Sequence, residues 1–271
     1  MTVRIYSSIL ISIVLISCSS TQKTTISSSC AQEKLLVAVA WYQNSAEMTA
    51  LYYQGFNIAK LRLDQAVQAN ISGKSLAVVV DIDETMLDNS PFETSLINSA
   101  DFQQGWYNWT TKASAKALPG ALEFTRFAQN KQVEIFYITN RDDNERGVTL
   151  KNLLNEGFPY ATDDHLLTKN DLAYSSGNTS SKAGRRAKVS EKHEIILLIG
   201  DNLNDFSEIF EDRSVNNGKE VVEKNMEQFG QKFIILPNPM YGAWEKPLYN
   251  YREGLNDAEK SQMLKNKLRK E

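Results

Sequence analysis

The chain has 271 residues, of which 42% are hydrophobic and 23% charged, an ordinary composition for a globular protein. This length allows one large domain, or a core with a small insertion. The formal net charge is −3 and no long basic run occurs, which excludes a protein that holds a nucleic acid polymer along a positively charged groove.

The N-terminus has the features of an export signal. Arg4 precedes the apolar run 9–16, which is too short to span a bilayer permanently. The run ends in Leu15-Ile16-Ser17-Cys18, which resembles the bacterial lipobox. That resemblance implies a signal peptide over 1–17, a lipid on Cys18, and a protein anchored in the bacterial cell envelope, in the outer membrane. An ordinary signal peptide with a chance cysteine is the alternative.

Residues 18–30 are mostly Ser, Thr and Gln, a composition that predicts a flexible tether. Cys30, at its end, has no second free cysteine with which to form an internal disulfide. We therefore expect the folded domain to span 31–271.

The domain begins with apolar residues at helical spacing over 31–70, which predict one long helix or two. Four apolar runs follow, at 76–80, 133–138, 195–199 and 233–236, with helical patterns between them, notably at 120–130 and 144–156. Such alternation predicts an α/β fold with a central parallel sheet flanked by helices.

Two segments do not fit this alternation. Residues 89–118 are rich in aromatic side chains, and we expect them to form an inserted cap over the strand ends. Residues 163–190 are polar, with Gly and Ser in the middle, and predict a loop.

Polar clusters follow the first three predicted strands. They are Asp81-Ile82-Asp83-Glu84-Thr85, then Thr139-Asn140-Arg141, then the run from Gly200-Asp201 to Asp205. The carboxyl ends of parallel strands meet at one edge of a sheet, so these clusters should converge there. Several carboxylates without His or Cys favour a hard cation, with Mg²⁺ as the default.

The spacing of Asp81 and Asp83 has a chemical meaning. Residues i and i+2 at a strand end can project to the same side. One carboxylate can then attack phosphorus while the other handles the proton of the leaving oxygen.

The motifs Asp-x-Asp-x-Thr, Thr139 and Gly200-Asp201 to Asp205 together resemble those of the haloacid dehalogenase (HAD) superfamily. Together with the stretches at 40–47 and 237–245, these motifs resemble those of class C acid phosphatases. These enzymes are also called the lipoprotein e(P4) family of 5'-nucleotidases. The resemblance spans roughly residues 35–250. The resemblance implies a Rossmann-like core with a small, mainly helical cap, and hydrolysis of nucleotides and nicotinamide mononucleotide.

The resemblance also implies roles for the four aspartates. Asp81 would form an aspartyl-phosphate. Asp83 would be the general acid and then the base, with its backbone carbonyl facing the metal. Asp201 would be a metal carboxylate, and Asp205 would support the metal site without direct coordination.

For the phosphate, the resemblance implies that Thr139 and Asn140 hold its oxygens. A lysine is also needed to offset the charge of the nucleophile and the phosphoryl group. Lys182 is the best match, with Lys188 and Lys169 as alternatives because this loop departs from the commoner pattern.

Trp106 and Tyr241 match family positions where aromatic rings flank the planar ring of the substrate, although packing in the cap or core is an alternative for either. Trp109 and Trp244 are expected to be structural.

The sequence thus predicts a magnesium-dependent phosphatase acting on small phosphate monoesters. A phosphotransferase with the same covalent chemistry, or a surface lipoprotein with a ligand-binding role, remain alternatives. The oligomeric state stays open, a homodimer included.

Overall fold

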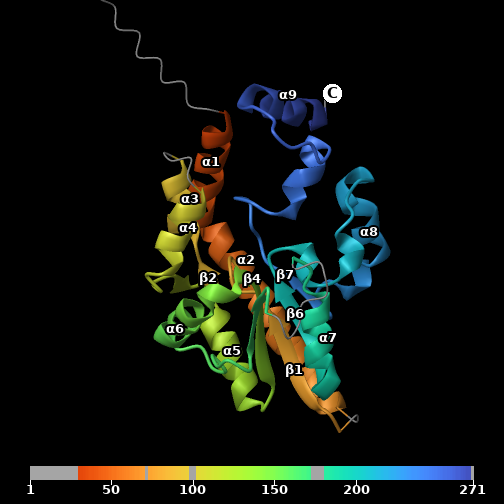
Figure 1. The fold of residues 1–271 in the computed structure, drawn as a ribbon. Helices are drawn as coiled ribbons and strands as arrows, with labels where there is room; N and C mark the ends of the chain where they lie inside the picture. Colours follow the sequence, from red (N-terminus) through yellow and green to blue (C-terminus); the bar gives the residue numbers. More distant parts are fainter. Residues whose placement is uncertain (1–29, 71–72, 98–101, 172–179, 270–271) are drawn as a thin grey trace, which may run out of the picture.

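The computed structural model describes residues 30–70, 73–97, 102–171 and 180–269 (Figure 1). The predicted signal peptide and nearly all of the predicted tether lie outside these residues. Within them, no helix is both long enough and apolar enough to cross a membrane.

A five-stranded parallel sheet forms the centre, in the order β5-β4-β1-β6-β7. The strands are β1 Ser75–Val80, β4 Glu134–Asp142, β5 Leu166–Lys169, β6 His193–Gly200 and β7 Phe233–Ile235. β1 is the middle strand, and every residue after Ser75 in it is buried. The predicted α/β fold with a central parallel sheet is therefore confirmed.

Helices cover both faces of the sheet (Figure 1). Val78 and Val80 of β1 pack in one core with α2 (Ala46–Ala69), α5 (Ala121–Asn130) and α6 (Arg146–Glu156). Ala77 and Val79 face a second core that includes α7 (Ala183–Lys192) and α8 (Lys219–Lys224). Successive side chains of a strand point to opposite faces of the sheet, so alternate residues of β1 enter opposite cores.

The predicted N-terminal helical segment is two helices, α1 Cys30–Asn44 and α2. The break falls at Ser45, whose hydroxyl accepts a hydrogen bond from the backbone N–H of Met48 at 3.1 Å and so caps α2.

The segment 89–118 contains α3 Ser90–Leu96 and α4 Phe102–Thr110. A short antiparallel pair, β2 Leu87–Asp88 with β3 Lys116–Ala117, joins its two ends. Helix α3 lies beside α1, and α9 Asp257–Lys267 contacts α1 near the same end of the molecule (Figure 1).

The prediction of a loop over 163–190 was wrong at both of its ends. β5 occupies 166–169 and α7 begins at Ala183. β5 has only four residues at the edge of the sheet, too few for a clear periodic pattern, and α7 is polar apart from a few positions such as the buried Val189.

Candidate active site

The carboxyl end of β4 and the loops that follow β1, β6 and β7 meet at one edge of the sheet and border a pocket of about 670 Å³. Among the predicted site residues, those that line it are Asp81, Asp83, Trp106, Asn140, Lys182, Asp201, Asp205 and Tyr241. Thr139 is the exception. It is fully buried behind the pocket, where its hydroxyl accepts a hydrogen bond from the backbone N–H of Arg141 at 3.0 Å.

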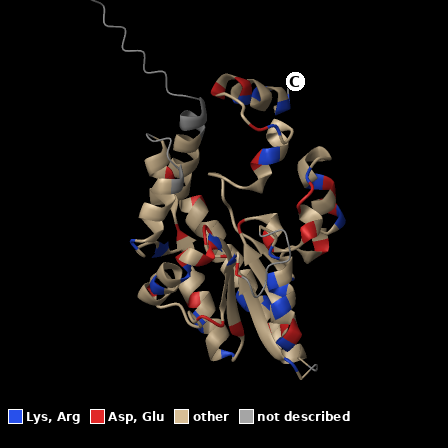
Figure 2. Ribbon diagram, viewed as in Figure 1, with Lys and Arg blue, Asp and Glu red and all other residues tan. Residues whose placement is uncertain are grey.

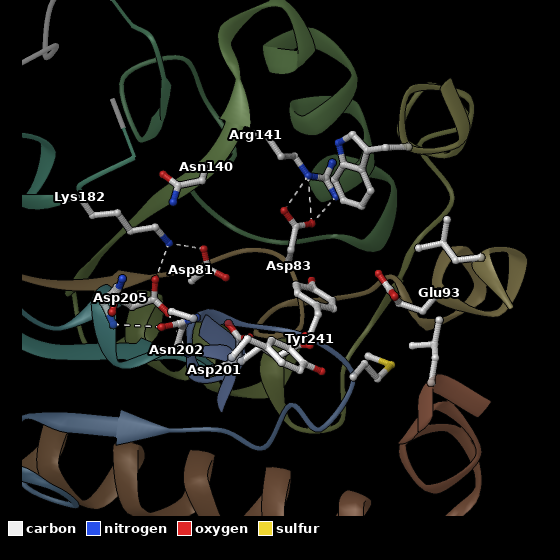
Figure 3. A pocket seen from close by; sticks show the side chains of 18 of the residues that line it. Asp81, Asp83, Glu93, Asn140, Arg141, Lys182, Asp201, Asn202, Asp205 and Tyr241 are labelled. Carbon is white, nitrogen blue, oxygen red and sulfur yellow. Dashed lines mark hydrogen bonds and ion pairs between the residues drawn. The ribbon is translucent and has the colours of Figure 1, made fainter. Parts of the chain in front are cut away.

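Lys182 lies between two of the aspartates (Figure 3). Its ammonium donates to Asp81 Oδ1 and forms an ion pair with Asp205 Oδ1 at 2.7 Å. Burial opposes the charge on Lys182, but the attraction of Asp205 and Asp81 outweighs it and raises the pKa of the lysine. Lys188 instead pairs with Glu191 on the surface of α7, and Lys169 does not line the pocket. Of the three candidate lysines, the structure brings Lys182 to Asp81.

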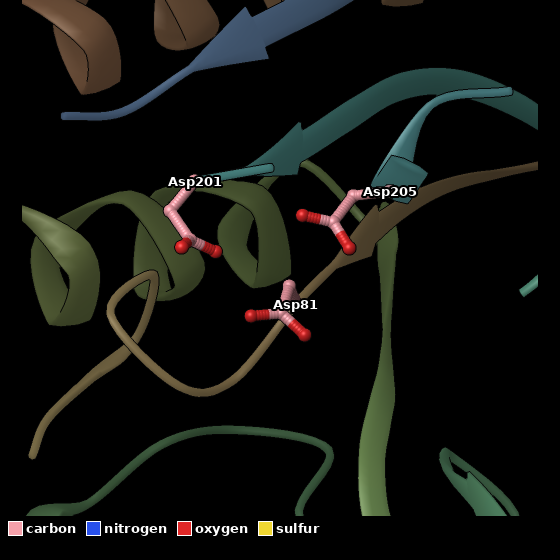
Figure 4. A group of neighbouring side chains, drawn as sticks. All are labelled: Asp81, Asp201 and Asp205. Atoms are coloured by element: carbon pink, nitrogen blue, oxygen red, sulfur yellow. The ribbon is translucent and has the colours of Figure 1, made fainter. Parts of the chain in front are cut away.

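Asp81, Asp201 and Asp205 form a cluster in which one oxygen of each carboxylate lies within 4.8 Å of the others (Figure 4). Gly200 makes room for it, because a Cβ there would collide with the Asp205 side chain. Burial, with Lys182 opposing it and Asp205 adding to it, raises the pKa of Asp81 to about 7. Burial, Asp205 and Asp81 raise the pKa of Asp201 well above its usual value.

One lysine therefore compensates the charge of these three carboxylates, of which Asp81 and Asp205 are buried, only in part. Asp205 uses both of its oxygens on protein donors, Lys182 and the backbone N–H of Asn202 at 3.0 Å. Asp201 is oriented by the amide of Asn238, which donates to its Oδ2 at 2.9 Å. An oxygen-only donor set with excess negative charge fits a hard divalent cation.

Arg141 also lines the pocket, although its position in the sequence predicts no role for it. Its guanidinium donates to Asp83 Oδ1 at 2.7 Å from Nη2 and at 3.0 Å from Nε (Figure 3). Asn89 Nδ2 donates to the same oxygen at 2.8 Å. Arg141 is 3% exposed. The carboxylate of Asp83 is therefore held against Arg141, apart from the three-carboxylate cluster. Its predicted metal contact, through the backbone carbonyl, stays a prediction.

Asn140 lies at the pocket wall in a fixed orientation. Its Oδ1 accepts from Arg185 Nη2 at 2.7 Å, and its Nδ2 donates to the carbonyl of Ser180 at 3.1 Å. Arg185 also donates to the carbonyl of Thr139. This arginine of α7 thus fixes the end of β4 against the segment that carries Lys182.

The two predicted ring-binding residues both line the pocket. Trp106 packs edge-on against Phe92, with ring centroids 5.2 Å apart, and the Arg141 guanidinium lies 5.4 Å from its ring centroid. The Tyr241 hydroxyl donates to Glu84 Oε2, and Glu84 is fully buried. Tyr241 is therefore anchored at its hydroxyl end, while its ring borders the pocket.

Outside the pocket lining, Trp109 donates from Nε1 to Asn89 Oδ1 at 2.8 Å, and Trp244 donates to the carbonyl of Tyr241 at 3.1 Å. Both tryptophans thus fix neighbouring backbone or side chains, which agrees with the structural roles predicted for them.

Arg141→Lys should lower kcat by up to ~100-fold with a smaller change in KM, because a lysine cannot reproduce the paired contact and Asp83 would lose its orientation. Steady-state kinetics on a simple phosphate ester will measure it, with the exposed Arg126→Lys as a control for charge-conserving change. Wild-type kcat in Arg141→Lys would show that this contact does not orient the reacting group.

The chain is similar to known proteins over most of its length. The family model described as HAD superfamily, subfamily IIIB (Acid phosphatase), matches residues 11–244. A class C acid phosphatase structure from Bacillus anthracis is 41% identical, with a TM-score of 0.81, and the match covers 89% of this chain and 99% of that one. A second structure of that enzyme, with tungstate bound, is 40% identical, with a TM-score of 0.80 and the same coverage.

A curated plant relative, "Acid phosphatase 1" of Solanum lycopersicum, is 26% identical over 171 residues, or 60% of this chain. The match spans 57% of the length of that relative. The family model covers most of the chain, and the bacterial structures share its fold over nearly their whole length. The chain therefore belongs to the HAD superfamily, subfamily IIIB, the acid phosphatases.

Proposed function

We propose that the protein hydrolyses phosphate monoesters through an aspartyl-phosphate on Asp81. The observation that carries this proposal is the position of the Asp81 carboxylate. It lies buried in the pocket, with Lys182 at one oxygen and two further carboxylates beside it. The tungstate bound by the Bacillus anthracis relative is a tetrahedral oxyanion like phosphate, which supports an oxyanion site in this family.

In the first step a carboxylate oxygen of Asp81 bonds to phosphorus, and the bond from phosphorus to the leaving oxygen breaks. Asp83, protonated at that stage, gives its proton to the leaving oxygen. In the second step Asp83 takes a proton from a water molecule that attacks phosphorus, which breaks the bond to Asp81 and releases phosphate. Lys182 offsets the negative charge of the phosphoryl group during both transfers.

The contacts of Asp83 favour one of its oxygens for proton transfer. Oδ1 accepts from Arg141 Nη2, from Arg141 Nε and from Asn89, at 2.7, 3.0 and 2.8 Å. Oδ2 receives only a 3.2 Å contact from Arg141 Nε. Oδ2 is thus the oxygen with capacity left to carry the proton.

Mg²⁺ is the cofactor we propose, held by Asp81, Asp201 and the backbone carbonyl of Asp83, with Asp205 in support. When bound, it supplies positive charge that offsets the repulsion between a carboxylate and a phosphate ester. The residues themselves fix the site: Asn238 orients Asp201, and Lys182 orients Asp205.

The proposed substrates are 5'-nucleotides and nicotinamide mononucleotide. A phosphate group alone would fill little of a 670 Å³ pocket, and Trp106 and Tyr241 offer ring faces for a planar group. The test is a panel of phosphate esters assayed with and without Mg²⁺. Hydrolysis of none of them would contradict the proposal, and product analysis with an added alcohol would reveal a phosphotransferase.

Trp106→Ala and Tyr241→Ala should each weaken binding of a nucleotide by on the order of 1–3 kcal/mol, or roughly 5- to 150-fold in kcat/KM, because one stacking face is lost. A small aliphatic phosphate never uses that face, so its kcat/KM should change much less. Tyr241→Phe is the matched control, since it keeps the ring and removes only the bond to Glu84. Equal losses on both esters would mean that the rings hold the fold and do not contact the substrate.

We also propose that the protein is a lipoprotein of the cell envelope, anchored in the outer membrane through Cys18. Cys18→Ala should block lipid attachment and either leave the precursor uncut or release the protein from the membrane fraction. Metabolic labelling with a fatty acid and membrane fractionation will measure both outcomes. Unchanged processing and partition in Cys18→Ala would make the lipobox resemblance accidental.

A further inference from the structure

A second acidic group lies in the pocket, apart from the aspartates that follow β1 and β6. Glu93 of α3 and Glu245 of the 3-10 helix Ala243–Tyr249 both line the pocket. Glu93 is only 5% exposed, and its carboxylate has neither a hydrogen-bond donor nor an ion-pair partner among the residues that the structure describes. In Figure 3 this carboxylate points into the pocket, on the side where Tyr241 lies. Burying a carboxylate without a partner costs free energy. A ligand in the pocket with a hydrogen-bond donor or a positive charge would provide the missing partner.

The helix that carries Glu93 is fixed on both sides of it. The backbone N–H of Ser90 donates to Asp88 Oδ1 at 2.8 Å. The side-chain amide of Gln43 donates to Ser90 Oγ at 3.0 Å and to Thr94 Oγ1 at 3.1 Å. These contacts hold α3 in place on either side of Glu93, so its carboxylate is kept at the pocket.

The charged groups that line the pocket favour a positively charged ligand group beside Glu93. Burial and, to a smaller extent, the neighbouring Glu245 raise the pKa of Glu93 to about 7. Arg141 and Lys182 are already paired with aspartates. Among the described lining residues, only Lys260 of α9 adds another positive charge.

The pocket that Glu93 lines also has aromatic and apolar walls. They include Trp106, Tyr241 and Tyr249, together with Leu96 and Leu264. Aromatic faces attract a cation through their quadrupole, most strongly where water is excluded. A carboxylate beside aromatic faces is the combination that recognises an ammonium group or a cationic ring.

We propose that Glu93, assisted by Glu245, forms a subsite for positive charge on the leaving group of the substrate. This subsite rests on the proposed phosphatase function and adds one substrate class to it, phosphate esters with a positively charged leaving group. The favoured esters have a phosphate at Asp81 and an ammonium or cationic ring at the far side of the pocket, against Glu93. Esters of the same shape without the charge are poorer substrates, because they leave this carboxylate unpaired.

The test uses two esters of nearly the same shape, 4-(trimethylammoniomethyl)phenyl phosphate and its neutral counterpart 4-neopentylphenyl phosphate. Their kcat/KM ratio is measured at about pH 8, above the pKa of about 7 of the Glu93 carboxyl. The proteins compared are the wild type, Glu93→Gln, Glu245→Gln and the exposed control Glu123→Gln. Comparing ratios between variants cancels the different reactivities of the two leaving groups. We expect the preference for the cationic ester to fall roughly tenfold or more in Glu93→Gln. It should fall less in Glu245→Gln and stay unchanged in Glu123→Gln.

An unchanged ratio in Glu93→Gln, or equal losses on both esters, would overturn the inference, since Glu93 would then be a structural residue of α3. A melting temperature at or above that of the wild type is expected for Glu93→Gln, because the variant removes a buried charge. If the wild type hydrolyses neither ester nor any other phosphate ester, the proposed function itself fails, and that outcome is distinct from hydrolysis without charge preference.

Discussion

Asp81→Asn is expected to lower the hydrolysis of every phosphate ester by roughly 10⁴-fold or more, as when a covalent nucleophile is removed. Asparagine keeps the shape of the side chain, and its amide oxygen can still accept the hydrogen bond from Lys182. What it lacks is the negative charge that attacks phosphorus. The variant should therefore fold and bind substrate while losing the chemical step.

Two controls separate this effect from a damaged fold. The exposed Asp164→Asn makes the same chemical change at the surface and should have wild-type kcat. Thermal unfolding of Asp81→Asn should give a melting temperature close to the wild-type value, because the change relieves charge repulsion among three neighbouring carboxylates. Near-wild-type turnover by Asp81→Asn would rule out covalent catalysis by this residue.

Removal of the metal is the second change with a large expected effect. Excess chelator should abolish wild-type activity, and added Mg²⁺ should restore it, because the carboxylate cluster has too little positive charge of its own. Asp201→Asn should weaken Mg²⁺ affinity by more than about 100-fold, since loss of a supporting residue already costs 10- to 100-fold. Asn238→Ala, which removes the amide that orients Asp201, should show the smaller effect.

Two measurements check the order of these effects. Activity is titrated against free Mg²⁺ for each protein, and the rise in melting temperature with Mg²⁺ is followed without substrate, which reports binding independently of turnover. Full wild-type activity in excess chelator, or equal Mg²⁺ dependence in the wild type and Asp201→Asn, would contradict the metal assignment.

The sequence predicted the centre of the fold because its signals are local. A continuous apolar run identified β1, and the residues directly after the strands identified Asp81, Asp83 and Asp201. β5 was missed because four residues at the edge of a sheet give almost no periodic signal.

The interactions within the site could not be predicted from local patterns. Lys182 contacts Asp81 across 101 residues of sequence, so no local pattern distinguishes it from Lys188 or Lys169. Arg141 follows Asn140 in the sequence, but its contact with Asp83 forms only because β1 and β4 lie side by side. Glu93 carries no motif at all. Its importance comes from burial without a partner in a pocket formed by distant segments.

A rapid-quench experiment tests most directly whether phosphate passes through a covalent bond to Asp81. The protein is mixed with a ³²P-labelled phosphate ester and Mg²⁺, quenched in acid within milliseconds, and digested. Borohydride treatment converts an aspartyl-phosphate to homoserine, which mass spectrometry can locate in the peptide. We predict label on the protein during turnover, homoserine at position 81, and neither in Asp81→Asn. Rapid hydrolysis without labelled protein, or homoserine at another aspartate, would contradict the account.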